Sequence, residues 1–204
     1  MSDNAIFQDV GGEPFPVPIA MATAESLKGY GTIVTDFDST KVEITPWPLK
    51  GWRKLCQDTS TLGRELRDDA FIQWVGNQCI VLGAEYTSGW LPKNVLPSNR
   101  THVLVREANY HPDGGQIFFP RNKDPFIALL ALPGDDIKMS DFQAFYFDGS
   151  FGVQIHADIW HQPVYPINDE AVILGKQGAV NACVAVDTVD EFGQYLLVPL
   201  TKPV

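Results

Sequence analysis

The chain has 204 residues, of which 45% are hydrophobic and 20% are charged, a composition that suits one large domain with a sizeable core. Acidic residues outnumber basic ones by 25 to 15, which gives a formal net charge of −10. This balance argues against nucleic-acid binding and against docking on anionic lipid, since both depend on clustered Lys and Arg.

Two segments have the pattern of short helices. Thr23 can cap a helix over residues 24–29, with Glu25 in the first turn and glycines closing it. Residues 60–70 can form a further helical turn or two. The 17 Gly and 15 Pro are spread along the whole chain, which favours many short elements over a helical bundle.

Almost all of the remaining chain has the pattern of β-strands. These runs are rich in β-branched or aromatic residues and are bounded by Pro, Gly, Asn or Asp. In chain order they cover 31–36, 42–45, 71–75, 79–86, 102–107, 116–119, 126–132, 142–147, 152–156, 171–174, 179–187 and 195–200. So many short strands with so few helices predict an antiparallel all-β fold, either a sandwich, a jelly roll or a barrel.

We interpret residues 1–204 as a single domain, with an N-terminal arm over 1–20 and a core at about 100–200, since no repeat or low-complexity tract divides the chain. Residues 1–20 lack the basic start and apolar run of a signal peptide, and no segment approaches the length that spans a bilayer.

The three cysteines, Cys56, Cys79 and Cys183, are odd in number, widely separated and form no CxxC pair. We therefore expect free thiols in a reducing compartment and a cytoplasmic protein.

Several catalytic signatures do not occur in the sequence. It contains no GxGxxG, Walker, HExxH or GxSxG motif, so we expect no nucleotide or organic cofactor. The four histidines are more informative, because all of them lie between positions 102 and 161. We interpret His102 as a packed or surface residue, and the other three fall within two short polar motifs.

The first motif reads NYHPDGGQ and extends from Asn109 to Gln116. Asn109 and His111 are two positions apart, so on a strand they share a face. His111 and Gln116 flank a four-residue Pro-Asp-Gly-Gly loop, and across a tight hairpin they would be neighbours with Cβ atoms about 4.5–5.5 Å apart. We expect the three side chains to converge on one side of one hairpin.

The second motif covers residues 152–163 and holds His156 and His161. Five positions separate the two histidines, which puts them on opposite faces of a straight strand. A turn near Asp158 is needed to bring both to one site.

Each of these residues also has an ordinary structural interpretation: a strand His is usually packed, Asp-Gly-Gly is usually a hairpin, and a Trp is usually core. The combined set Asn109, His111, Gln116 and His161 nevertheless favours a site. Burying two imidazoles and two amides on one sheet face costs on the order of several kcal/mol unless partners, water or a ligand satisfy them.

These residues resemble the two sequence motifs of the cupin superfamily. Asn109, His111 and Gln116 occupy the three ligand positions of HxHx(3,4)E, and His161 occupies the ligand position that ends PxGxxH. Asn109 stands where general cupins carry His, and Asp158 stands where the second motif has Gly.

More narrowly, the chain resembles the ureidoglycolate lyase family, whose members are cupins. The matching text is HPxxxQxFxP from His111, the apolar run 126–132 followed by Gly-Asp-Asp, FQAF at 142–145, and GVxxHxxxWHxP at 152–163. The resemblance covers about 105–166, and 23–34 resembles the start of that family.

The resemblance implies a cupin double-stranded β-helix, a jelly-roll barrel, with an N-terminal strand and helix extension. It also implies a homodimer formed through N-terminal strands. Residues 15–18 and 33–34 are candidate edge material for this contact, since exposed strand edges must be covered.

The family reaction splits ureidoglycolate into glyoxylate and urea, in purine and allantoin degradation. It is an elimination that needs a base and an acid but no covalent nucleophile. The resemblance places His111, His156 and His161 in the reaction, and we expect His156 to be the general base or acid. We expect Arg106 or Arg121 to assist the substrate carboxylate, in a substrate-binding set with Gln116 and Trp160.

The resemblance also implies a divalent metal held by His111, Gln116, His161 and Asn109. Two imidazoles and two neutral amides leave the metal charge without a protein anion to offset it. That favours an anionic carboxylate substrate as a further ligand, and a nickel- or manganese-type ion over calcium.

Two alternatives remain open on the sequence. One is a metal-dependent cupin enzyme of other chemistry, such as an oxygenase, isomerase or hydrolase. The other is a cupin that binds a small acid without catalysis, or a structural β-domain.

Overall fold

Two β-sheets dominate the protein in a computed structural model that describes residues 8–45 and 64–204. The larger sheet has ten strands in the order β1 (Phe15–Pro16), β17 (Leu196–Pro199), β7 (His102–Val105), β6 (Tyr86–Trp90), β5 (Gln78–Leu82), β4 (Glu65–Val75), β15 (Glu170–Gly178), β9 (Gln116–Pro120), β12 (Gly152–Ile155) and β3 (Gly31–Val34). The smaller sheet runs β16 (Val184–Asp187), β8 (Glu107–Tyr110), β13 (Trp160–His161), β10 (Phe126–Ala131), β11 (Gln143–Phe147) and β2 (Ile19–Met21), with β14 (Tyr165–Pro166) paired to β10.

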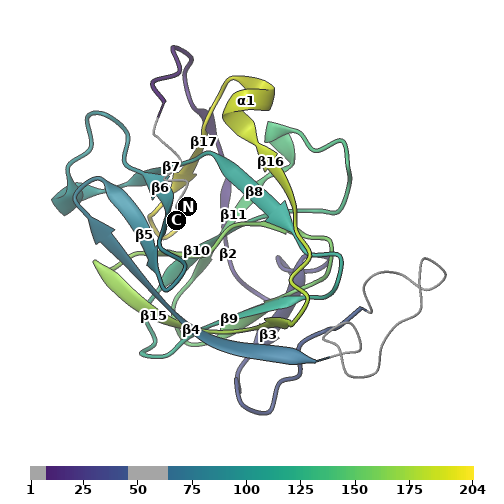
Figure 1. The fold of residues 1–204 in the computed structure, drawn as a ribbon. Coiled ribbons are helices and arrows are strands. Elements are labelled where there is room, and N and C mark those ends of the chain that lie inside the picture. The colour runs from purple at the N-terminus through teal and green to yellow at the C-terminus, as the bar shows by residue number, and fades with distance from the viewer. Residues whose placement is uncertain (1–7, 46–63) are drawn as a thin grey trace.

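The hydrophobic core lies between the two sheets. In Figure 1, β15, β9 and β4 of the larger sheet lie low in the view, while β8 and β16 of the smaller sheet lie above them. All six residues of β10 are buried, and Phe126 stacks on Phe147 with ring centroids 4.5 Å apart. The all-β prediction is therefore confirmed, and the two mixed sheets, which do not close on each other, are consistent with a cupin-like barrel.

The α-helix in the described part of the chain is α1 (Thr188–Phe192), which the sequence analysis did not predict. Two short 3₁₀ segments, η2 (Pro97–Asn99) and η3 (Met139–Asp141), lie in loops. The Asp187 carboxylate caps α1 by accepting the backbone N–H groups of Val189 and Asp190, and Gly193 ends the helix with a φ of 70°. No helix within the described residues is long and apolar enough to cross a membrane.

Both predicted helices differ from the structure. Residues 24–30 form consecutive turns, although Thr23 does accept the Ser26 N–H as a cap would. The helix expected over 60–70 is wrong for its described part, because β4 begins at Glu65. Nine residues of β15 pair with β4 in antiparallel register, and this long-range pairing overrides the local helix preference.

The hairpin expected between His111 and Gln116 is also wrong. β8 pairs with β13 and β16 in one sheet, while β9 pairs with β12 and β15 in the other. The segment between them is a corner that passes from sheet to sheet. Gly115 makes this corner possible, because a Cβ there would lie 2.4 Å from the Ile155 carbonyl oxygen.

Several strand limits also differ from their predicted ranges. The strand expected over 79–86 is a hairpin of β5 and β6, whose turn contains Gly83 and Glu85 at positive φ. The strand expected over 42–45 is reduced to a single bridge between Ile44 and Gly114. The short strands β1, β2, β13 and β14 were not predicted.

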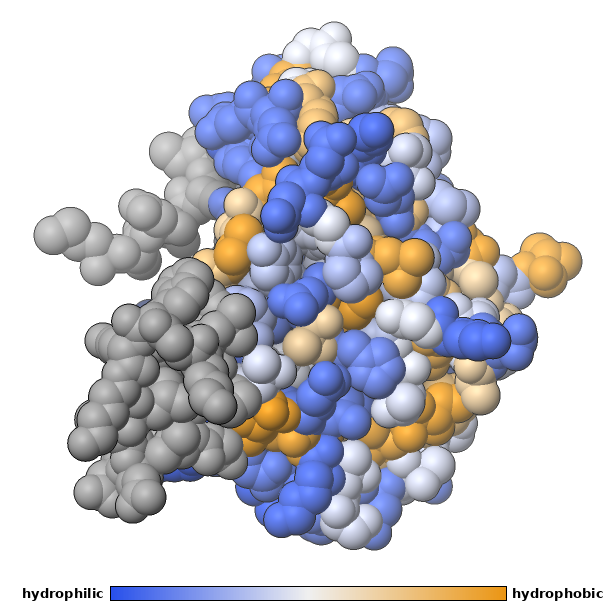
Figure 2. Space-filling view, turned by 90° about the vertical axis from the view of Figure 1, so that its right-hand side faces the viewer, coloured by the Kyte–Doolittle hydropathy of each residue, from blue (hydrophilic) through white to orange (hydrophobic). Residues whose placement is uncertain are grey.

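The face on the right of Figure 1 is mostly hydrophilic. Figure 2 shows that blue residues predominate on it, with orange residues in small groups.

Shortening Ile72 to Ala should test the strand assignment of β4. Ile72 has no exposed surface, so we expect Ile72→Ala to lower the free energy of unfolding by about 2–5 kcal/mol. Val75, at the end of the same strand, is 48% exposed, and Val75→Ala should cost under about 1 kcal/mol. Urea unfolding of both variants measures the difference, and equal losses would contradict the assignment.

Candidate active site

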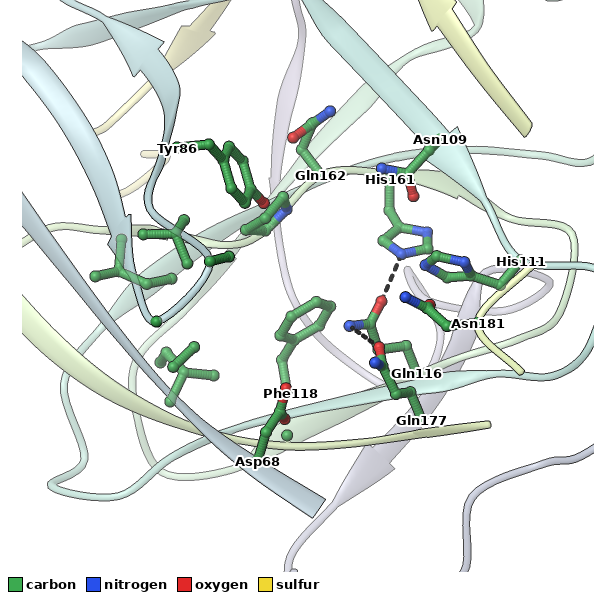
Figure 3. A pocket seen from close by; sticks show the side chains of 18 of the residues that line it. Asp68, Tyr86, Asn109, His111, Gln116, Phe118, His161, Gln162, Gln177 and Asn181 are labelled. Carbon is green, nitrogen blue, oxygen red and sulfur yellow. Dashed lines mark hydrogen bonds between the residues drawn. The ribbon is translucent and has the colours of Figure 1, made fainter. Parts of the chain in front are cut away.

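A cavity of about 560 Å³ lies between the two sheets. Strands β4, β5, β9 and β15 supply one wall, and β8, β13 and the segment before β16 supply the other. Figure 3 shows that six polar side chains of the lining gather on one side, whereas Phe118, Tyr86 and Asp68 lie on the other. The polar group consists of Asn109, His111, Gln116, His161, Gln177 and Asn181.

His161 is the most deeply buried of these residues, with 3% of its surface exposed. Its position on β13 is directly opposite Asn109 on β8 and Leu130 on β10. Its Nδ1 lies 2.7 Å from the Ile159 carbonyl oxygen, which can only accept, so Nδ1 carries the proton. Burial, together with nearby His111, lowers the pKa of His161 to about 3, so the ring is neutral and Nε2 bears a lone pair.

The His111 ring is likewise fixed by a hydrogen bond from Nδ1 to a backbone carbonyl. Its Nδ1 lies 2.8 Å from the carbonyl oxygen of Ala182, so this nitrogen donates and Nε2 is left facing the cavity. The two imidazole rings meet edge to face with centroids 5.1 Å apart. Backbone carbonyls thus fix both rings with their Nε2 atoms available to a ligand.

The half-buried amide side chains of Gln116 and Asn109 complete this end of the cavity. Gln116 Oε1 lies 2.8 Å from His161 Nε2, and Gln116 Nε2 donates to Gln177 Oε1 at 3.1 Å. The Oδ1 atom of Asn109 is buried and has no hydrogen-bond partner within the described residues. A buried acceptor without a donor lowers the stability of the fold. Its presence indicates that a ligand or cation binds next to Asn109 Oδ1.

The four predicted metal ligands therefore do line one cavity, although they arrive from two sheets rather than from one hairpin. Their chemistry fits a divalent cation, because two imidazole lone pairs and two amide oxygens face the same end and backbone carbonyls orient both rings. The described residues contain no group of three or more His, Cys, Asp or Glu side chains that could hold a metal, so such a site depends on the amide oxygens.

The other predicted site residues do not line this cavity. His156 Nδ1 lies 3.2 Å from a carboxylate oxygen of Glu43, and Asp158, at a φ of 64°, makes the expected turn without bringing His156 to His161. Trp160 is buried, and its indole N–H donates to the Gly134 carbonyl oxygen.

The two predicted arginines are bound to carboxylates elsewhere. Arg106 forms ion pairs with Asp187 at 2.7 Å and with Asp190 at 3.1 Å. Arg121 pairs with Asp69, whose side chain lines the cavity while that of Arg121 does not. The roles of these residues in a reaction stay predictions.

Several cavity residues were missed by the sequence analysis, among them Glu107, Asp68 and Gln177. Glu107 precedes Asn109 by two positions on β8, so the alternation that pairs Asn109 with His111 also predicts that Glu107 faces the cavity. Asp68 was hidden because its strand was interpreted as a helix. Gln177 lies opposite Gln116 on β15, and only the pairing of distant strands reveals it.

The carboxyl groups in the cavity have raised pKa values. Burial raises the pKa of Asp68, and neighbouring Asp69 raises it further. Burial likewise raises the pKa of Glu107, with Asp187 adding to the effect and Arg106 opposing it. Among the described residues, the lining holds three carboxyl groups, on Asp68, Asp69 and Glu107, and neither Lys nor Arg.

Comparison with known proteins shows to which family this chain is similar. A family model described as ureidoglycolate lyase matches residues 78–190. Curated proteins named ureidoglycolate lyase from Salmonella enteritidis and from Salmonella newport are each 36% identical to the chain over 63 residues. That stretch is 31% of this chain and 39% of each relative, so the match spans about two-fifths of the length of these curated relatives.

Replacing Asp113 should loosen the support of His111. Asp113 is 2% exposed, and its carboxylate accepts the backbone N–H groups of Asn181 and Ala182, the residue whose carbonyl holds His111. Asp113→Asn turns one acceptor into a donor, so we expect the free energy of unfolding to fall by about 1–3 kcal/mol.

The matched control for this prediction is Asp136→Asn, because the Asp136 side chain is 97% exposed. It should change the free energy of unfolding by less than about 0.5 kcal/mol in the same urea titration. An Asp113→Asn variant as stable as this control would contradict the supporting role.

Proposed function

Because the chain belongs to the ureidoglycolate lyase family, we propose that it cleaves ureidoglycolate, or a closely similar 2-hydroxy-acid adduct, into glyoxylate and urea. The family match over residues 78–190 covers more than half of the chain and contains all four proposed metal ligands. The observation that carries the proposal is the convergence of His111, His161, Gln116 and Asn109 on one end of one cavity.

The reaction requires two proton transfers and no covalent intermediate. A base removes the proton of the carbinol hydroxyl, the carbon–nitrogen bond breaks as the carbonyl of glyoxylate forms, and an acid protonates the departing urea nitrogen. The thiol in the cavity lining, that of Cys183, is poorly suited to nucleophilic attack, since burial, with Glu107 adding to the effect, raises its pKa.

The charge of the cavity favours a bound cation. An anionic substrate entering a lining of three carboxyl groups without Lys or Arg would be repelled. We propose that His111, His161, Gln116 and Asn109 hold a divalent ion of the nickel or manganese type. When bound, such an ion offsets the substrate carboxylate and polarises its oxygen atoms as a Lewis acid.

Glu107 is the residue that we propose for proton transfer. Its carboxyl lines the cavity, and the raised pKa brings it closer to the pH at which it can both accept and release a proton. His156, the residue expected from the sequence, is held beside Glu43 outside the lining and is the alternative to be tested.

The proposal extends to a homodimer, as the family resemblance implies. β1 and β3, the end strands of the larger sheet, contain the segments that the sequence analysis singled out as edge material. Unprotected sheet ends favour pairing with a second copy.

Removing metal ions should test the cation and the reaction together. We expect protein treated with a chelator to release little glyoxylate from ureidoglycolate, and added nickel or manganese to restore the release. His161→Ala should remain inactive at the same metal concentration. Full turnover after exhaustive chelation, with no metal by elemental analysis, would exclude the cation.

The same assay separates the proposed substrate from other chemistries. Oxygen consumption with ferrous iron in place of glyoxylate release would indicate an oxygenase. Binding of small acids that His161→Ala leaves unchanged, with no turnover by either protein, would indicate a binding module.

Substituting Glu107 and His156 in parallel should identify the proton-transfer residue. We expect Glu107→Gln to lower kcat by about 10²- to 10⁴-fold, the usual contribution of a general acid or base, and His156→Asn to stay within about threefold of the parent. The plot of kcat against pH for Glu107→Gln should also lack the rise or fall that the ionisation of Glu107 causes in the parent. The reverse pattern would restore His156 to this role.

A further inference from the structure

His161 and Gln116 face each other with two hydrogen-bond acceptors, so they form no hydrogen bond as they stand. His161 donates from Nδ1 to the Ile159 carbonyl oxygen, so Nε2 of the neutral ring is an acceptor. The atom facing it at 2.8 Å is Gln116 Oε1, which is an acceptor as well. Two lone pairs at this distance repel unless a positive charge or a proton lies between them.

Besides protonation of His161 Nε2, two arrangements remove this repulsion. In the first, a cation would accept both lone pairs, and the separation of 2.8 Å is close to the roughly 3.0 Å between neighbouring ligand atoms of an octahedral ion whose bonds are about 2.1 Å long. In the second, the Gln116 amide turns over, so that its NH₂ group donates to His161 Nε2. The first arrangement binds a cation, whereas the second takes one ligand oxygen away from it.

Gln177 distinguishes these two arrangements. It lies opposite Gln116 in the register of β15 and β9, and its Oε1 accepts the Gln116 NH₂ group at 3.1 Å. This bond holds the Gln116 oxygen toward His161, as Figure 3 shows with its two dashed lines. If Gln116 turned over, Gln177 would have to turn as well to donate to the Gln116 oxygen.

We propose that Gln177 is a positioning residue for the cation site, which sets cation affinity by keeping the Gln116 carbonyl oxygen turned toward His161. The inference rests on the proposed function, since that function supplies the reason for a cation. Gln177 does not touch the cation in this scheme and acts through the amide of Gln116.

Replacements at position 177 that differ in hydrogen-bond capacity test this role. Leu neither accepts nor donates, so Gln177→Leu leaves Gln116 free to donate to His161. We expect the dissociation constant for Ni²⁺ or Mn²⁺ to rise by about 10- to 100-fold, the usual effect of losing a group that orients a ligand. Glu accepts only, so Gln177→Glu should bind at least as tightly as the parent.

Isothermal titration of the metal-stripped full chain with Ni²⁺ or Mn²⁺ measures these constants without reference to turnover. Gln177→Glu also adds a negative charge, and Asn181→Asp is the control for that effect. It adds a carboxylate to the cavity lining on a residue outside the Gln116–Gln177 pair. Equal affinities for Gln177→Leu and the parent would overturn the proposal.

A double variant separates positioning from packing. The Gln116→Glu replacement supplies two oxygen atoms and no NH₂ group, so its carboxylate cannot present a donor to His161. In this background we therefore expect Gln177→Leu to change the dissociation constant by less than about threefold, compared with about 10- to 100-fold in the parent. A loss of the same size in both backgrounds would overturn the positioning role.

The failure of this inference can be told from failure of the proposed function. A parent protein that releases glyoxylate from ureidoglycolate while Gln177→Leu binds metal normally would contradict only the role of Gln177. A parent that binds Ni²⁺ or Mn²⁺, loses affinity on Gln177→Leu and yet releases no glyoxylate would support the inference and contradict the substrate.

Discussion

The candidate site depends on two hydrogen bonds from imidazole rings to backbone carbonyls. Ile159 accepts from His161 and Ala182 accepts from His111, and these bonds assign the proton of each ring to Nδ1. Both Nε2 lone pairs must then face the cavity. The backbone therefore sets the chemistry of this site before any ligand enters it.

The supports of these carbonyls explain why distant parts of the chain matter to the site. The segment that carries Ala182 is fixed by Asp113, a buried carboxylate close to His111 in the sequence but bonded to residues some seventy positions away. The corner from β8 to β9 passes close to Ile155 because Gly115 has no side chain. A motif that appears local in the sequence is thus held by contacts between both sheets.

The sequence indicated which residues form the candidate metal site but not how they are arranged. Alternation along a strand and the resemblance to a known family identified Asn109, His111, Gln116 and His161, all of which line the cavity. Spacing alone does not reveal whether a Gly-rich loop is a hairpin or a corner between sheets, because the outcome depends on strand partners far along the chain. The same limit explains why Asp68 and Gln177 were missed: strand pairing with β15 places Asp68 on β4, and pairing with β9 places Gln177 beside Gln116.

The cavity lining shares the acidic character of the whole chain, and this bears on the choice of metal ligands. Its lining offers lone pairs and carboxyl groups but, among the described residues, no Lys or Arg, in a protein with a formal charge of −10. Asp69 of that lining is paired with Arg121, but no Lys or Arg among the described lining residues would attract an anionic 2-hydroxy acid. In the proposed site, two neutral imidazoles and two amides would leave most of the charge of a bound cation uncompensated, so the cation would attract an anionic substrate more strongly than it could with a carboxylate among its ligands. The neutral amide of Gln116 at the Glu position of the motif would, in that proposal, compensate for the carboxyl groups elsewhere in the lining.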